Sequence, residues 1–366
     1  MTTCMYCNAE LPDGSTTCPR CGEGGPAPAA MAGTPDQPRS ANRRLGLLVL
    51  GGMSLMAAIG LAFALSTTES RRANDNRNQD RSLPPGPILA DAAEFAGMDV
   101  MPSDVHVLAG IDASRLRQSA AGEALVQRLP VGSAETAGHI DQVLIGLQVR
   151  AFPPKWWAAI HAPTDAAATR LRGSLMSPPA QGRGNRTISQ SPLLRGIGLQ
   201  CWIADADRRT LVAAQLPSDF DAIPEAPGRG PQRFQHVGPL LTDRLPRNSA
   251  AWLVAQVEPD KNAIPAMLAL MPLAPGDRAV WQNLQSVVLS VRPIGADLDA
   301  SLDIRGRDAA ATQALAEMIE KSLGAAGIVA DRKADGDWQR LTARLSAADV
   351  VKLGPAGIRF APAGPK

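Results

Sequence analysis

The sequence has few aromatic residues and almost no net charge. Aromatic side chains make up 4% of the 366 residues, and 37 Lys and Arg against 35 Asp and Glu leave a formal net charge of +2. Proteins that bind nucleic acid over a large surface carry a clear basic excess, and single strands stack on aromatic side chains. The composition therefore predicts no nucleic-acid partner.

Cysteine is scarce beyond the first 21 residues, where Cys201 stands alone. The large C-terminal region therefore contains no internal disulfide. Because Cys201 lies between Gln200 and Trp202 in an apolar stretch, it is predicted to be a small buried side chain rather than a reactive thiol.

Catalytic motifs are also missing. The sequence contains no HExxH helix, GxSxG elbow, SxxK motif or GxxxxGK[ST] loop. The histidines are far apart in sequence, and those in apolar strand patterns, His106 and His161, favour structural roles over metal binding. The acidic stretch "IADADRR", with Asp205 and Asp207, favours a plain polar turn over a weak calcium site. The missing motifs favour a protein without enzymatic activity, and an enzyme is the alternative.

Four of the five cysteines stand in two CxxC pairs within "CMYCNAELPDGSTTCPRCG". Two such pairs can hold zinc in a tetrahedron of four thiolates, and the turn residues 12–14 between them can bring the pairs together. The spacing predicts a closed, structural Zn²⁺ site whose metal supplies the folding energy of the unit 1–24. A redox dithiol and two disulfides are the alternatives. The predicted ligands are Cys4, Cys7, Cys18 and Cys21.

Residues 4–22 resemble the short zinc-ribbon family of bacterial and archaeal proteins, which is marked by CxxC, a hairpin and CPxCG. The resemblance implies that the four cysteines are zinc ligands without a catalytic role. It also implies that the unit serves to hold a partner or another domain. Residues 1–42 carry two arginines against four carboxylates, which disfavours nucleic acid here as well.

An apolar run from Leu45 to Leu65 contains no charge over 21 residues, about the length of a transmembrane helix. We expect an uncleaved span over 43–66, between a flexible linker at 25–42 and a polar linker at 67–88. A cleaved signal peptide is the main alternative, because 62–64 has the A-x-A form. A buried core helix is disfavoured, since few soluble helices are apolar all round.

The orientation of the span does not follow from charge, because arginines flank both of its ends. Zinc thiolate sites are favoured where thiols stay reduced, which predicts a cytoplasmic N-terminus and an extracytoplasmic C-terminal region. The expected partners are the lipid bilayer and an unknown protein. A homodimer is a further alternative, because small residues share one face of the span and could form a contact between two helices: Ser54, Ala58 and Ala62.

Three segments recur in the same order further along the chain. "DAAAT" begins at Asp165 and again at Asp308, an offset of 143. "IDQVLIGLQVR" at 140–150 aligns with "LQSVVLSVRPI" at 284–294, and the stretch from 101 aligns with that from 245, both at an offset of 144. The pattern predicts an α+β region built from two tandem similar halves with antiparallel sheets, 89–238 and 239–362.

Each half is expected to contain a strand, a helical stretch, a pair of strands, a second helix and one or two closing strands. Asp165 and Asp308 can each cap the second helix of their half. In "LDASLDI", the apolar residues from Leu298 to Ile304 alternate and should face one way. The predicted strands are Val105–Ile111, Gln142–Phe152, Trp156–Ala162, Ala251–Val257, Ser286–Arg292 and Asp297–Ile304.

Two basic stretches rich in Gly and Pro, 177–192 and 224–234, predict solvated surface loops. The aromatic pair Trp156 and Trp157 lies in a predicted strand, so the two indoles should point to opposite faces. Packing is favoured for both side chains over a binding role.

Together these features predict a non-enzymatic single-span membrane protein with a cytoplasmic zinc ribbon as an interaction module. Its duplicated extracytoplasmic domain would bind an unknown partner or ligand. The layout loosely resembles a set of uncharacterised bacterial envelope proteins, a resemblance that implies no particular activity or site residue. An envelope hydrolase with a site between the two halves, and a transmembrane sensor, are the alternatives.

Overall fold

The computed structural model describes residues 2–3, 10–11, 95–127, 138–149, 154–183, 186–191, 201–224, 230–257 and 279–352. The predicted zinc ligands, the span 43–66 and both linkers lie outside the described residues, as does the first part of the helical stretch expected after the strand Ala251–Val257. Among the helices that the structure describes, none is both long and apolar enough to cross a membrane.

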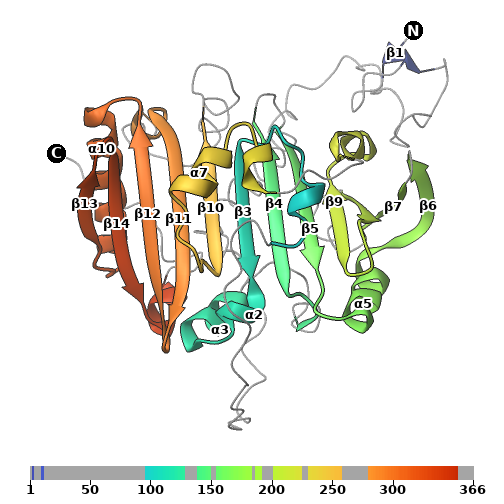
Figure 1. The fold of residues 1–366 in the computed structure, drawn as a ribbon, viewed down its shortest axis with the longest axis horizontal. Coiled ribbons are helices and arrows are strands. Elements are labelled where there is room, and N and C mark those ends of the chain that lie inside the picture. The colour runs from blue at the N-terminus through green and yellow to red at the C-terminus, as the bar shows by residue number, and fades with distance from the viewer. Residues whose placement is uncertain are drawn as a thin grey trace, which may run out of the picture.

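A single antiparallel sheet of 12 strands forms the body of the described region (Figure 1). Its N-terminal half consists, from the centre outward, of β3 (Val107–Asp112), β4 (Gln142–Gln148), β5 (Lys155–His161), β9 (Thr210–Ala214), β8 (Trp202–Asp205), β7 (Arg186–Gln190) and β6 (Ser177–Arg183). Its C-terminal half consists of β10 (Ala251–Gln256), β11 (Leu284–Ile294), β12 (Asp297–Gly306), β14 (Trp338–Leu345) and β13 (Asp331–Asp335). The expected α+β class with antiparallel pairing is confirmed.

The two halves of the sheet meet where β3 pairs with β10. Ala109 lies opposite Leu253, so the residues facing each other at this point are themselves 144 positions apart. The same offset relates the register of β3 and β4 to that of β10 and β11, where Val107 opposite Leu147 corresponds to Ala251 opposite Val291. The strand register therefore agrees with the offset between the similar segments of the sequence.

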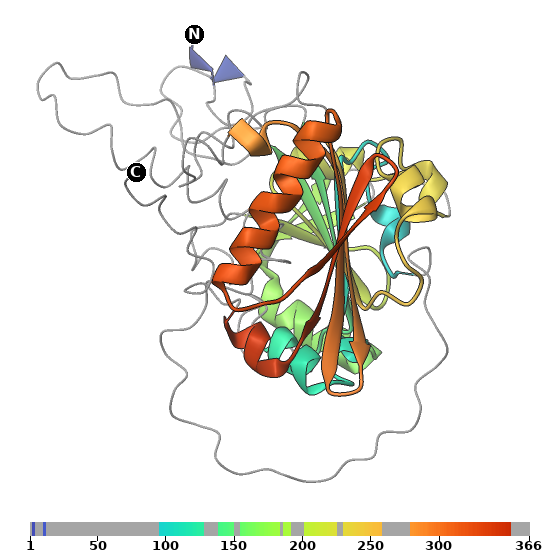
Figure 2. The ribbon, with the colours of Figure 1, turned by 90° about the vertical axis from the view of Figure 1, so that its left-hand side faces the viewer.

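Helices cover the two faces of the sheet unequally (Figure 2). One face packs against a set of α-helices that includes the two longest described, and it contains the largest buried cluster. On the other face, short helical segments pack around Trp157 and Trp252. The first set contains α2 (Ala113–Leu116), α3 (Ala120–Val126), α5 (Asp165–Leu175), α10 (Ala309–Ala325) and α11 (Ala347–Lys352). The second contains η3 (Met98–Val100), η4 (Pro217–Ala222), η5 (Pro231–Arg233) and α7 (Gly238–Asp243).

The starts of the two long helices follow from their capping residues. The Asp308 carboxylate accepts the N–H of Ala311 at 2.8 Å, which confirms it as the cap of α10. The matching prediction for Asp165 is wrong by one residue, because Thr164 caps α5. Asp165 is the first helical residue and pairs instead with the Arg209 guanidinium at 2.8 Å.

Strand β12 and helix α10 pack as the apolar patterns predicted. Leu298 and Ile304 are buried on the helix side of β12, and the helix buries Leu315 against the sheet. The helical stretch expected after the first strand is interrupted, because the Ser119 hydroxyl accepts the N–H of Gly122 and caps a new helix that begins at Ala120.

The interpretation of 177–192 as a solvated loop is wrong. This stretch forms the hairpin β6–β7 at the edge of the N-terminal half of the sheet, where β7 pairs with β8. An edge strand can accept Pro because its outer side has no partner strand. The local composition therefore did not exclude a strand.

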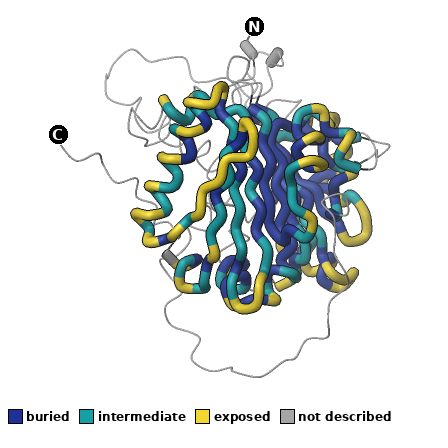
Figure 3. Tube along the Cα trace, turned by 60° about the vertical axis from the view of Figure 1, so that its left-hand side comes forward, coloured by how far each residue is buried: buried dark blue, intermediate teal, exposed yellow. Residues whose placement is uncertain are grey.

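Burial falls from the centre of the sheet toward the C-terminal edge (Figure 3). The described residues of β3 are all buried, and those of β13 are all exposed. Four of the five β13 residues are charged ("DRKAD"), a composition that protects an open edge from pairing with another strand.

Candidate functional site

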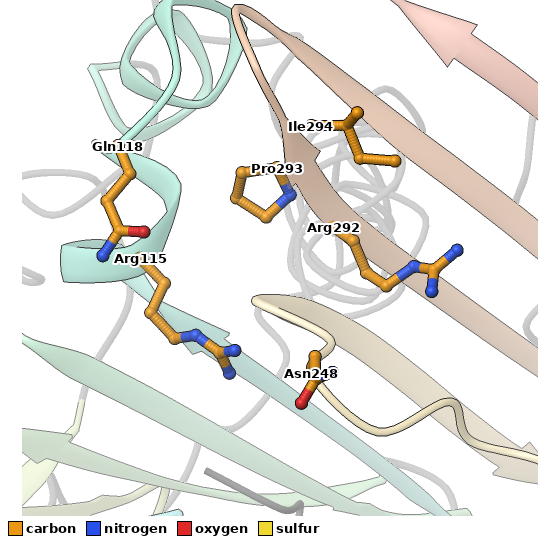
Figure 4. A pocket seen from close by; sticks show the side chains of 6 residues that line it. All are labelled: Arg115, Gln118, Asn248, Arg292, Pro293 and Ile294. Carbon is orange, nitrogen blue, oxygen red and sulfur yellow. The ribbon is translucent and has the colours of Figure 1, made fainter. Parts of the chain in front are cut away.

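A cavity of about 300 Å³ lies where the two halves of the sheet meet, and we call it the junction cavity. It is formed by helix α2 and the turn after it, by the loop before β10, and by the end of β11 (Figure 4). Its lining residues are Arg115, Gln118, Asn248, Arg292, Pro293 and Ile294. Segments that are far apart in sequence therefore share one hollow.

Hydrogen bonds hold these segments in place. The buried Asp112 carboxylate caps α2 by accepting the N–H of Arg115 at 2.9 Å, which fixes where the Arg115 side chain leaves the helix. The backbone N–H of Asp112 donates to the carbonyl of Ala250 at 2.7 Å, and the N–H of Ala250 donates to that of Val291 at 2.8 Å. The cavity walls are therefore continuous with the sheet, the arrangement that keeps a binding site rigid.

Asn248 lines the cavity with an unusual backbone conformation. Its φ of 74° makes it the one non-glycine residue with positive φ among the described residues. Asn tolerates this left-handed region better than most residues, at a modest cost in energy. Such conformations persist where the surroundings hold them, and they are frequent at ligand sites.

The two arginines of the junction cavity differ in their electrostatic state. Arg292 is paired with Asp299, its neighbour across the β11–β12 ladder. Arg115 forms no ion pair with a described residue, and its Nη1 is buried without a hydrogen-bond partner in the described structure. In Figure 4 the Arg115 guanidinium lies on the side of Asn248, whereas that of Arg292 extends away from it. Arg115 is therefore the arginine of the cavity that no described carboxylate pairs with.

An unused buried donor is costly. Leaving a buried polar group unsatisfied costs about 1–3 kcal/mol, and more when the group is charged. An acceptor that reached Nη1 of Arg115 would recover this energy. Arg115 is therefore the group around which a ligand would be organised.

A second, larger cavity of about 470 Å³ lies near the C-terminal edge of the sheet, between the turn after α10 and strand β14. Two of its polar side chains are engaged within the protein: Asp349 accepts hydrogen bonds from Ser346, and Arg344 pairs with Asp297 at 2.9 Å. Its carboxylates make no metal site, since the described residues contain no group of three potential metal ligands. Among the described residues that line this cavity, no buried side-chain polar atom lacks a hydrogen-bond partner.

The tertiary structure brings together two histidines that are far apart in sequence. The rings of His106 and His236 stack with centroids 4.1 Å apart and an interplanar angle of 14°. His106 is buried, and His161 lies within hydrogen-bonding distance of the Thr210 hydroxyl, with Nδ1 and Oγ1 separated by 3.0 Å. Both contacts agree with structural roles.

The acidic turn at Asp205 and Asp207 is a polar turn, as predicted. Asp207 accepts the backbone N–H groups of Arg209 and Thr210, at 2.7 and 2.8 Å. Although burial acts to raise it, these hydrogen bonds lower the pKa of Asp207. The Asp205 carboxylate forms an ion pair with Arg172 at 2.6 Å.

Cys201 and the two tryptophans behave as packing residues. Burial raises the pKa of the Cys201 thiol to about 12, so the thiol stays protonated and unreactive at neutral pH. Trp157 is buried in the cluster on one face of the sheet and donates from Nε1 to the carbonyl of Asp219 at 2.9 Å. Trp156 packs against the cluster on the other face, as the alternation of a strand requires.

Sequence analysis did not identify Arg115 or Asn248 as candidate residues. No motif links them, since they lie 133 residues apart and neither type is rare. The available signal was indirect: both residues lie in the pair of aligned segments that flank the central strands of the repeat.

No protein-family model and no curated protein matches this chain. Among solved structures, the chain is similar to the protein TP0453. Crystal form I of TP0453 matches with a TM-score of 0.42 and 11% identity, over 72% of this chain and 98% of TP0453. Form III gives a TM-score of 0.41 with 10% identity, covering 70% and 96% of the two chains. A likeness at this level does not extend to function.

Proposed function

We propose that the C-terminal region is a non-enzymatic binding module and that its ligand site is the junction cavity. The observation that carries this proposal is the buried Nη1 of Arg115, which has no hydrogen-bond partner among the described residues. Walls from both halves of the sheet surround this group. In this proposal the two halves are tandem copies of one α+β unit, supported by the shared register at an offset of 144.

The N-terminal part of the chain gives the module its place in the cell. We propose that Cys4, Cys7, Cys18 and Cys21 hold one structural zinc ion and that 43–66 spans the cytoplasmic membrane. The described strands β1 (Thr2–Thr3) and β2 (Glu10–Leu11) pair with each other on either side of the first CxxC, which is compatible with a small ribbon. The ribbon would lie in the cytoplasm as an interaction module, and the sheet domain outside.

The hydrolase alternative receives no support from the junction cavity. Its lining residues include no serine, cysteine, histidine or carboxylate. Acyl, glycosyl and phosphoryl transfer to water all need a nucleophile or a positioned base. The sensor alternative uses the same cavity, and it would add a change in the ribbon when a ligand binds.

Hydrogen exchange of the full-length protein tests the binding module. The probes are sodium phosphate, sodium butyrate, glucose and tetraglycine, which cover anionic, neutral and peptide chemistry. We expect at least one probe to slow amide exchange in 113–118, 248–250 and 291–294. If all four leave these segments unchanged, the junction cavity is not a ligand site and the proposal fails.

Topology and metal content test the rest of the proposal. In intact spheroplasts, added protease should remove a C-terminal tag from a protein that otherwise runs at full length. The purified protein should contain one zinc ion per chain, and Cys18→Ser should lower that content. A protected tag would place the sheet domain in the cytoplasm, and a zinc-free protein would exclude the ribbon.

A further inference from the structure

We infer that the junction cavity binds one small oxyanion, a carboxylate or phosphate group, through the guanidinium of Arg115. This inference rests on the proposed function and names the class of ligand. A guanidinium presents N–H donors in a planar fork that matches two oxygens of a carboxylate or phosphate. Arg115 has such a donor, Nη1, that is buried and unused by the described residues.

The other polar groups of the cavity favour an anion. Gln118 and Asn248 contribute neutral amides that can donate a hydrogen bond, and no carboxylate is among the lining residues. Asp112 lies at the start of the same helix, but its oxygens already accept from Ser114 at 2.7 Å and from Gln142 at 3.3 Å. An oxyanion would therefore meet donors rather than acceptors.

The apolar part of the lining limits the rest of the ligand. Pro293 and Ile294 form one side of the cavity, and Ile294 is unusually exposed for its type, at 44%. A volume of about 300 Å³ admits only a small molecule. A short carboxylate with a few carbon atoms satisfies both parts of the wall, whereas inorganic phosphate satisfies only the polar part.

The repeat supplies an internal comparison, because the opposite end of the central strands has corresponding positions at an offset of 144. Asn248 corresponds to Asp104, and Arg292 corresponds to Gln148. The Gln148 amide donates to the Asp104 carboxylate, so these two groups satisfy each other. The position that corresponds to Arg115 is Pro259. The described residues Asp104 and Gln148 therefore do not repeat the chemistry of the junction cavity, and we expect one ligand per chain.

The test is a titration of the full-length protein with sodium butyrate and, separately, with sodium phosphate. The readout is the NMR signal of the Arg115 side-chain Nε–Hε group, assigned by its absence in Arg115→Gln. We expect saturable binding of butyrate with one site per chain. Saturation by phosphate alone would identify the ligand group as a phosphate rather than a carboxylate. Saturation by both anions would identify a general oxyanion site.

Matched variants separate Arg115 from overall charge. Affinity, measured by calorimetry, should fall about tenfold or more in Arg115→Gln, because a charge-assisted pair of hydrogen bonds is lost. Arg115→Lys should retain part of the affinity. Arg170→Gln removes the same charge from an exposed position on α5 outside the cavity, and it should bind like the parent protein.

A second variant covers the case in which Arg115→Gln does not fold, as judged by circular dichroism. Asn248→Asp keeps a residue that tolerates positive φ and places a carboxylate in the wall, so it should also weaken anion binding. If Arg115→Gln or Asn248→Asp binds anions like the parent protein, or if neither anion saturates, the inference is overturned. If glucose or tetraglycine then slows amide exchange around the cavity, the proposed binding function is still supported. If neither does, both the anion site and the proposed binding function are refuted.

Discussion

Replacing Gly110 by alanine tests the central pairing of the sheet. Gly110 lies on β3 directly opposite Trp252 on β10, and a Cβ added there would stand 2.5 Å from Cε2 and 2.6 Å from Cζ2 of the indole. Ordinary contacts between carbon atoms lie at about 3.5–4.0 Å. The indole would have to withdraw by about 1 Å to make room for the methyl group.

The surroundings of the indole set the cost of that movement. Trp252 is 1% exposed, and it packs edge-on against Phe95 with ring centroids 5.4 Å apart. Overpacking a filled core costs about 1–3 kcal/mol, and a rigid, enclosed ring places Gly110→Ala near the upper end of that range. We expect the free energy of unfolding, measured by urea titration followed by circular dichroism, to fall by about 2–3 kcal/mol.

Two further variants make the reasoning refutable. Gly324→Ala adds a methyl group near the end of α10, where nothing lies within 4 Å, and it should leave stability unchanged or raised by up to about 1 kcal/mol. Trp252→Phe shrinks the ring, so adding Gly110→Ala to it should cost clearly less than in the parent protein. If Gly110→Ala is as stable as the parent protein, or if its cost is unchanged in the Trp252→Phe background, the indole does not lie over Gly110. The register of β3 and β10 would then be wrong.

Three other perturbations follow from the described contacts. Asp303 is 2% exposed and accepts two hydrogen bonds from Arg340, at 2.6 and 2.7 Å, so Asp303→Asn should lower the free energy of unfolding by about 2–4 kcal/mol. A loss under about 0.5 kcal/mol in urea titration would contradict this buried pairing. Burial raises the pKa of Asp219 above its ordinary value, so the native state binds this proton more tightly than the unfolded state does. The parent protein should therefore lose stability relative to Asp219→Asn as the pH of thermal melts rises from about 4 to about 7, and parallel curves would refute this assignment. The amides of 331–335 lie in an exposed edge strand and should exchange faster than those of 107–112 at the centre of the sheet, and equal protection would mean that something covers the edge.

Much of the local structure could be predicted from the sequence, because the causes are local. Alternating apolar residues identified β12, and a carboxylate before an Ala-rich stretch identified the cap of α10. The offset of 144 between similar segments of the sequence also relates the strand register of β3 and β4 to that of β10 and β11. A strand pattern predicts which side chains share a face even when the partner strand is unknown.

The predictions were wrong where a neighbouring residue could play the same role, or where the structure depends on a segment far away in the sequence. Asp165 is a residue type that commonly caps helices, but Thr164 caps α5. The Thr164 hydroxyl accepts the N–H of Ala167. The hairpin β6–β7 exists because β8 offers it an edge, which the Pro and Gly residues of 177–192 did not indicate. The stacking of His106 on His236 depends on the packing of a short helical region over the sheet.

By itself, the sequence determined the antiparallel α+β class and most strand positions, because these depend on residues close together in the chain. Only the tertiary structure decided that the two halves form one sheet, since this depends on how β3 meets β10. The same meeting creates the junction cavity and leaves Arg115 with a buried, unused donor. Neither the arginine nor its neighbours differ in sequence from ordinary surface residues, so their chemistry arises from burial and from partners more than a hundred residues away.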